Sequence, residues 1–152
     1  MEANTVGIEA AREYLNRARR LQSVIENKQH KIVALRDMAT STTATISDMP
    51  RSDSPNLQRM ETMLCKAADL EREIVADQAA TEAAKEEIMA AVFDMEDYRE
   101  QQVLYHRYVE CLAWAAVAEA CGCHVRTAHR FHDRGVEHMA EKLSHTGHPK
   151  NT

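Results

Sequence analysis

The chain has 152 residues, 44% of them hydrophobic, and a formal net charge of -5. This length allows one domain with an appendage, and the acidic balance excludes a chain that is basic along its whole length. The charge is uneven, however. Residues 57–101 hold 12 acidic and 5 basic side chains, whereas residues 102–152 hold 5 acidic and 6 basic ones with 7 of the 8 histidines. The C-terminal third is therefore still a candidate for contact with nucleic acid.

The N-terminal residues lack the apolar run of a signal peptide, and no stretch is long and apolar enough to span a membrane. We therefore expect no membrane contact and a cytoplasmic location. The four cysteines should stay reduced there, so a disulfide framework is not expected.

Glycine and proline are nearly absent from the middle of the chain, where only Pro50 and Pro55 lie between Gly7 and Gly122. A β protein needs turn residues at about every ten positions. The sequence therefore predicts an all-α fold with one marked loop.

Two segments, residues 8–39 and residues 55–93, carry apolar residues at alternating spacings of three and four. This is the heptad pattern of coiled-coil helices. Lys28 is the one polar residue in the first stripe, and Asp77 and Thr81 are polar positions in the second. We expect a long antiparallel two-helix coiled-coil hairpin, through which two copies of the chain could form a homodimer.

Residues 40–54 break the heptad pattern with clustered Ser and Thr residues and predict the loop of the hairpin. Ser54 followed by Pro55 is a typical helix start, with a capping hydroxyl before a proline at the first helical position. The first helix is net positive and the second is acidic, so flanking ion pairs favour their pairing, although each exposed pair contributes little.

A second helical region follows the hairpin. Asp97 and Glu100 have the spacing of a capping box, which predicts a helix over residues 98–110. Two further helices are expected over residues 113–121 and residues 125–143.

These elements predict three parts along the chain. The hairpin occupies residues 1–95 and a helix-turn-helix domain occupies residues 96–145. Residues 146–152 are polar and are expected to form a flexible tail.

The stretch around Gly122 has the register of a helix-turn-helix. Ala118 is small enough to let two helices cross closely, and Gly122 supplies the positive φ of the turn. Trp114 and Phe131 are expected to pack in the core of this motif. The remaining side chains of the second helix face outward and can donate to base edges and phosphates in a major groove. The expected DNA-binding residues are His124, Arg126, Thr127, His129, Arg130 and Arg134.

The segment YREQQVLYHRYVECLAWAAVAEACGCHVRTAHRFHDRGVEHMAEKL resembles region four of bacterial sigma factors, and more closely the sigma-region-four-like regulators of phages and prophages, including ArpU-type proteins. EYLNRARRLQSVIENKQHKIVALRDMAT and the loop residues SDMPRSDSP resemble the coiled-coil half of the same phage family. The residues that carry the first likeness are Val103, Leu104, Arg107, Tyr108, Trp114, Val117, Ala118, Gly122, Arg126, Thr127, Arg130 and His132.

The resemblance implies a sequence-specific DNA-binding transcription regulator in the cytoplasm of a bacterial host. Its partners would be double-stranded DNA and host RNA polymerase, with no cofactor. The sequence departs from the family at Ala113 and His124, which stand at helix-capping positions, and at Gly135, inside the recognition helix. A poor cap costs about 1 kcal/mol, and a glycine inside a helix costs a similar amount.

Two other functions compete with this one. A phage small-terminase-like subunit also joins a helix-turn-helix to oligomerisation helices, and an interaction module would bind polymerase or sigma factor without DNA. We expect neither an enzyme nor a metal site. The hairpin offers no obvious cleft for catalysis, and the Cys121, Cys123 and His124 cluster lacks the spacing of a zinc finger.

Overall fold

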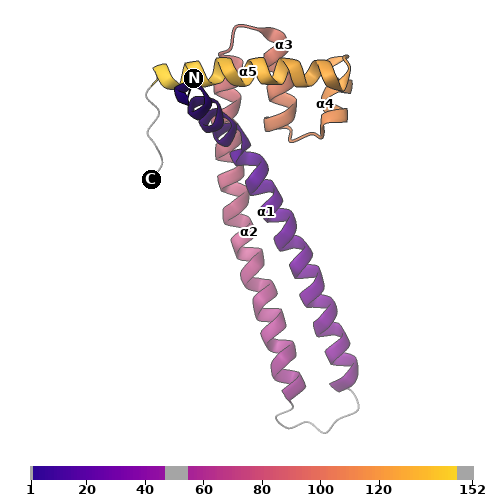
Figure 1. The fold of residues 1–152 in the computed structure, drawn as a ribbon. Helices are drawn as coiled ribbons and strands as arrows, with labels where there is room; N and C mark the ends of the chain where they lie inside the picture. The colour runs from indigo at the N-terminus through magenta and orange to yellow at the C-terminus, as the bar shows by residue number, and fades with distance from the viewer. Residues whose placement is uncertain (1, 47–54, 147–152) are drawn as a thin grey trace. The chain divides into compact units, whose positions relative to one another are not determined.

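The computed structural model describes residues 2–46 and 55–146, and every element in them is helical. The elements are α1 (Glu2–Ile46), α2 (Pro55–Phe93), α3 (Tyr98–Leu104), the π-helical turn η1 (Tyr105–Val109), α4 (Trp114–Cys121) and α5 (Val125–His145), and Figure 1 labels the five α-helices. The all-α prediction is therefore confirmed. No helix among these residues combines the length and apolar character needed to cross a membrane.

The predicted bounds of α2 are confirmed, but α1 is longer than predicted at both ends. Its first turns include Gly7, which packs near Ala140 of α5. A Cβ added at Gly7 would lie 3.9 Å from Cβ of Ala140. At the other end, residues 40–46, predicted as loop, are helical. The hydroxyls of Thr40 and Thr42 donate to carbonyls one turn earlier, which lets these residues continue the helix. The remaining predicted loop residues, 47–54, and the tail after residue 146 lie outside the described residues.

The helix predicted over residues 98–110 is also different in detail. It begins as predicted, because the Asp97 carboxylate accepts hydrogen bonds from the backbone N–H groups of Arg99 and Glu100. Its second half is a π-helical turn, with the Glu110 N–H bonded to the Tyr105 carbonyl at 3.1 Å. Such a turn inserts one extra residue and is a known feature of functional or strained helix segments. The heptad and helix periodicities of the sequence carry no sign of it.

The chain divides into two compact units, which are described separately. The two-helix unit comprises residues 21–80, from α1 and α2. The multi-helix unit combines residues 1–20 and residues 81–152, and so contains the start of α1 and the end of α2 together with α3, η1, α4 and α5. The predicted boundary after residue 95 stays a prediction about functional domains. The packing groups the start of α1 and the end of α2 with the C-terminal helices.

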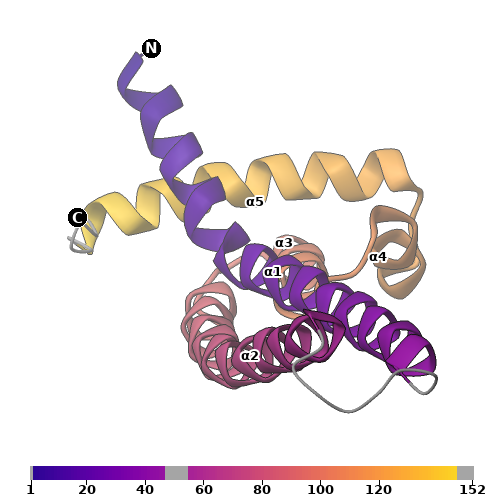
Figure 2. The same cartoon turned by 90° about the horizontal axis from the view of Figure 1, so that it is seen from below.

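In the two-helix unit, α1 and α2 lie side by side, as both views show (Figures 1 and 2). Lys28 Nζ lies 2.6 Å from Oδ2 of Asp77 and 3.1 Å from Oε2 of Glu73, and Arg36 pairs with Glu71. These pairs show that the two helices run in opposite directions. The buried core comes from the predicted stripes and consists of Ile25, Ile32, Ala67 and Ile74, with Leu35 and Leu70 packed against it.

The multi-helix unit has a larger core, to which every one of its helices contributes. Its largest fully buried apolar side chains are Leu15, Ile88, Val92, Val103, Leu104, Val117, Val136 and Met139. The helices α3 and α5 approach each other closely at Gly135. A Cβ at Gly135 would lie 3.1 Å from Cδ1 of Leu104 and 3.3 Å from Cβ of Glu100. The glycine inside α5, a departure from the helix rules, therefore permits this close approach.

Candidate nucleic-acid interface

The turn between α4 and α5 is built on Gly122, as predicted. Gly122 ends α4 with φ 65° and ψ 34°, in the left-handed region. The Cys123 N–H donates to the Ala118 carbonyl at 3.0 Å, and the Gly122 N–H donates to the Glu119 carbonyl at 3.1 Å. These two bonds form the Schellman arrangement, which fixes the direction in which the chain leaves α4. Nothing lies within 4 Å of a Cβ added at Gly122, so positive φ alone requires the glycine.

A small apolar cluster holds α4 and α5 together. Val103, Val117, Ala118 and Ala128 are buried in it. Trp114 and Phe131, predicted as core, are only partly buried at its edge. The inner face of α5 is thus fixed against α3 and α4, and the opposite face is left open.

The open face of α5 carries most of the predicted DNA-binding residues. His124, Arg126, His129, Arg130 and Arg134 are exposed, whereas Thr127 is partly buried. Arg126, Arg130 and Arg134 are spaced four apart, so they follow one line along the helix.

The weak helix starts read from the sequence are also seen. The side chain of His124 makes no capping hydrogen bond at the start of α5, and Ala113 makes none at the start of α4. The ring of His124 is therefore not used to hold the helix. His124 is the residue before the first turn of α5, where the unpaired backbone N–H groups attract anions such as phosphate.

Trp114 lies in a stack of cationic and aromatic groups beside this face. The Arg107 guanidinium lies 4.5 Å from the Trp114 ring centroid, and the His129 ring centroid lies 3.9 Å from it. Arg107 also donates to the Leu112 carbonyl at 2.9 Å, and burial together with the nearby Arg19 charge lowers the pKa of Arg107. His129, predicted as a DNA donor, is thereby held in a defined position by a ring contact.

His132 lies beneath this stack and is part of the core. Tyr108 O–H donates to its Nε2 at 2.5 Å, and its Nδ1 lies 3.1 Å from the carboxylate of Asp133. Burial lowers the pKa of His132 and raises that of Tyr108. Burial therefore disfavours the protonated form of His132.

Arg134 and His138 connect α5 to a buried carboxylate on α3. Glu100 is 1% exposed, and its Oε2 lies 2.6 Å from Nδ1 of His138. Nε of Arg134 lies 3.9 Å from the other carboxylate oxygen, which has no hydrogen-bond partner within the described part of the chain. The hydrogen bond to Glu100 raises the pKa of His138, so this ring favours the charged form.

Sequence reasoning assigned Glu100 to a capping box, which is only half formed. Asp97 caps α3 as predicted, but the Glu100 side chain turns inward to His138. A signal was available: Glu100 stands three and four residues before Val103 and Leu104, on the stripe that α3 buries. An acidic residue on a buried stripe predicts a cationic partner on the facing helix.

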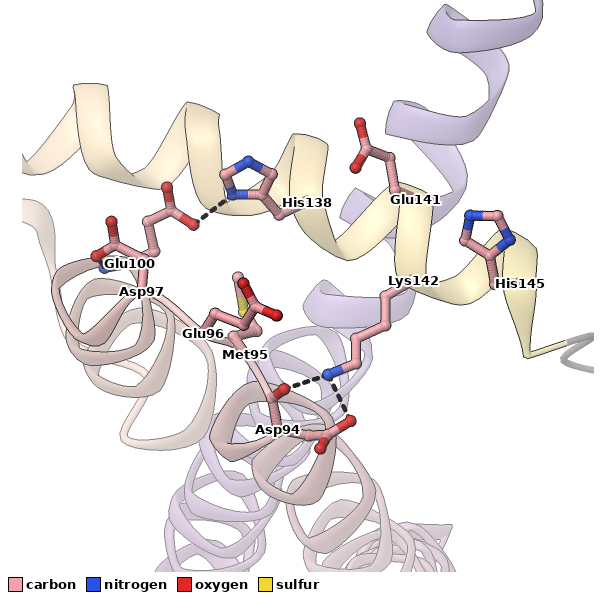
Figure 3. A pocket seen from close by; sticks show the side chains of 9 residues that line it. All are labelled: Asp94, Met95, Glu96, Asp97, Glu100, His138, Glu141, Lys142 and His145. Atoms are coloured by element: carbon pink, nitrogen blue, oxygen red, sulfur yellow. Dashed lines mark hydrogen bonds and ion pairs between the residues drawn. The ribbon is translucent and has the colours of Figure 1, made fainter.

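A cleft of about 650 Å³ opens next to this pair, between the start of α3 and the end of α5 (Figure 3). Lys142 bridges it by bonding to the carbonyl and carboxylate of Asp94. Acidic side chains dominate its lining, which consists of Asp94, Met95, Glu96, Asp97, Glu100, His138, Glu141, Lys142 and His145. This acidic side of the unit would repel a nucleic-acid backbone, so the arginine line on α5 is the better candidate surface.

The residues considered for zinc do not form a metal site in the described structure. No group of three His, Cys, Asp or Glu side chains there is placed to hold an ion, and no disulfide joins the four cysteines, which all lie in the described residues. Burial raises the pKa of Cys121, which favours its protonated form. Cys111 also adopts φ 58°, a left-handed conformation that the sequence did not reveal.

Comparison with known proteins gave no family assignment: no protein-family model, no curated protein and no solved structure matches this chain significantly.

Proposed function

We propose that this chain is a sequence-specific DNA-binding transcription regulator of phage or prophage type, in which α4 and α5 act as a helix-turn-helix. The observation that carries the proposal is the pair Arg126 and Arg130. Both are exposed, and they stand one turn apart on a helix whose opposite side is anchored. Within the described residues neither is engaged by a carboxylate, so both guanidinium groups are available for base edges or phosphates.

The anchoring of α5 supports this function. A reading helix must keep its side chains in a fixed register with the groove. Here the Schellman turn at Gly122 fixes one end, and the contacts of Gly135 and His138 with α3 fix the middle. The exposed face is thus carried by a helix with little freedom to rotate.

Selection from random DNA followed by footprinting tests the proposal. We expect one enriched motif, and affinity that falls steeply with salt because phosphate contacts supply much of it. Arg130→Ala should lower specific affinity by about 1–3 kcal/mol. Arg59→Ala is the matched control, since Arg59 is exposed on α2 in the other unit. No enriched motif, or equal effects of the two substitutions, would contradict the assignment.

A second candidate function is a polymerase- or sigma-binding module, favoured by an aromatic surface on the multi-helix unit. Phe93 is 56% exposed and Tyr98 is 68% exposed. The Phe93 ring stacks on Tyr105 with centroids 5.5 Å apart. Exposed aromatic side chains are typical anchors of protein interfaces. Binding of purified RNA polymerase that is lost in Tyr98→Ser, together with no DNA binding at low salt, would favour this function over the first.

A further inference from the structure

A groove runs along one side of the two-helix unit, with a volume of about 480 Å³. Leu35 and Leu70 form its half-buried floor, and Met38 is 48% exposed beside them. Its charged residues are two lysines and two carboxylates. The complete lining is Lys31, Ala34, Leu35 and Met38 from α1, and Lys66, Asp69, Leu70 and Glu73 from α2.

The buried apolar residues of the two-helix unit form a thin stripe. The core cluster of this unit holds three isoleucines and one alanine, Ala67, along two long helices. Large apolar side chains that stay exposed on the unit include Val33 at 58% and Val75 at 67%. A helix pair with one thin stripe of core is marginal by itself, and further packing against apolar side chains would stabilise it.

The lining residues are arranged symmetrically along both helices. On α1, residues 31 and 38 stand equally far from the midpoint between residues 34 and 35. On α2, residues 66 and 73 stand equally far from the midpoint between residues 69 and 70. The Lys28–Asp77 pair lies about seven residues from each midpoint, so the two midpoints are at the same level of the helix pair. A two-fold axis that lies in the plane of the contact at this level places the groove of a second copy against the first, with each helix facing its own counterpart in the opposite direction.

We propose that the groove binds a second copy of this chain, packed antiparallel across that two-fold axis. In such an isologous contact each pair of residues occurs twice. Glu73 then faces Lys66 of the partner subunit, and the aliphatic part of Lys31 covers Met38 of the partner subunit. The leucines of both copies meet at the centre, while the Asp69 carboxylate at the same level is paired with Arg72 of its own chain. The complementary charges at the two ends fix the antiparallel direction.

Dimerisation through this groove involves the two-helix unit alone and does not require DNA binding. It also gives Lys66 and Glu73 of the groove a role. Lys66 and Glu73 are both exposed, and within the described residues Lys66 forms no ion pair, while the pairs of Glu73 and Asp69 are with Lys28 and Arg72. A second copy supplies the missing carboxylate for Lys66.

Charge reversal with mixing tests the proposal on the full chain, using sedimentation equilibrium. The wild type should be a dimer. Lys66→Glu and Glu73→Lys should each weaken self-association by about tenfold or more, because each brings like charges together twice. An equimolar mixture of the two variants should dimerise again, since both contacts of the mixed dimer pair Glu with Lys. Glu61→Lys, exposed on α2 outside the groove, is the control and should leave the dimer unchanged.

Ala34→Glu provides an independent variant if Glu73→Lys, which also removes a contact of Lys28, fails to fold. Ala34 is exposed and lies at the proposed centre, so a glutamate there should give a helical monomer by circular dichroism and sedimentation. Three outcomes would each overturn the proposal. They are a monomeric wild type, a dimer or larger ring unaffected by the groove variants, and a mixture that fails to restore association.

Discussion

The two-helix unit is held by one stripe of apolar residues and a row of ion pairs between α1 and α2, whereas in the multi-helix unit short helices cross at close contacts. The first arrangement depends on a repeating pattern, so many positions are interchangeable. The second depends on single residues, such as Gly135 at a helix crossing and Glu100 on a buried face. We infer that sequence changes will have small and similar effects in the two-helix unit and large, position-specific effects in the multi-helix unit.

Leucine truncation should give the largest difference between the units. Leu104 is fully buried in the multi-helix unit and lies against Gly135. Leu104→Ala should lower the free energy of unfolding by about 3 kcal/mol, through lost burial and the cavity that remains. Leu64 is 46% exposed in the two-helix unit, and Leu64→Ala should cost about 0.5 kcal/mol or less. Urea unfolding followed by circular dichroism measures both, and equal costs would refute the proposed contrast.

The turn glycine should have the next largest effect. Gly122→Ala meets no steric obstacle, so its cost is the left-handed backbone alone, about 1–2 kcal/mol. Gly122→Asn should cost less, because asparagine tolerates this conformation better. Gly7→Ala is the matched control. Gly7 is helical and its new Cβ would make only ordinary contact with Ala140, so we expect no loss of stability. Thermal unfolding that ranks the three variants differently would show that Gly122 is not limited by its φ.

The same contrast explains which features could be predicted from the sequence. The periodic stripes, the start of α2 at Pro55 and the turn at Gly122 are local patterns, and the structure bears them out. The spacing of Glu100 from Val103 and Leu104 indicates a buried carboxylate, but it does not identify the partner, His138, which is 38 positions away. The π-helical turn at Tyr105–Val109 is also set by packing rather than by propensity.

The exposed arginines of α5 could likewise be placed from the sequence, because helical spacing alone puts Arg126 and Arg130 on one face. The stack of His129 on Trp114 could not, since it requires the mutual orientation of α4 and α5. A DNA target cannot be read from either kind of feature, because base recognition depends on how the whole helix sits in a groove.

The smallest expected effect concerns two histidines of the multi-helix unit, which should respond to pH in opposite directions. The pKa of His138 is raised by its hydrogen bond to Glu100, so its contribution to stability is complete below the unfolded pKa of ~6.5 and is lost as pH rises through the higher folded value. The pKa of His132 is lowered by burial, so its contribution is present above ~6.5 and is lost as pH falls.

His138→Gln should therefore remove the loss of stability as pH rises above ~6.5, while leaving the loss on acidification. The effect should be modest, because the His138 side chain is 54% exposed and solvent screens its charge. Melting temperatures at several pH values measure it, and His30→Gln is the control, since His30 is exposed in the two-helix unit. A His138→Gln profile that parallels the wild type across this range would mean that the Glu100 contact does not depend on the charge of His138.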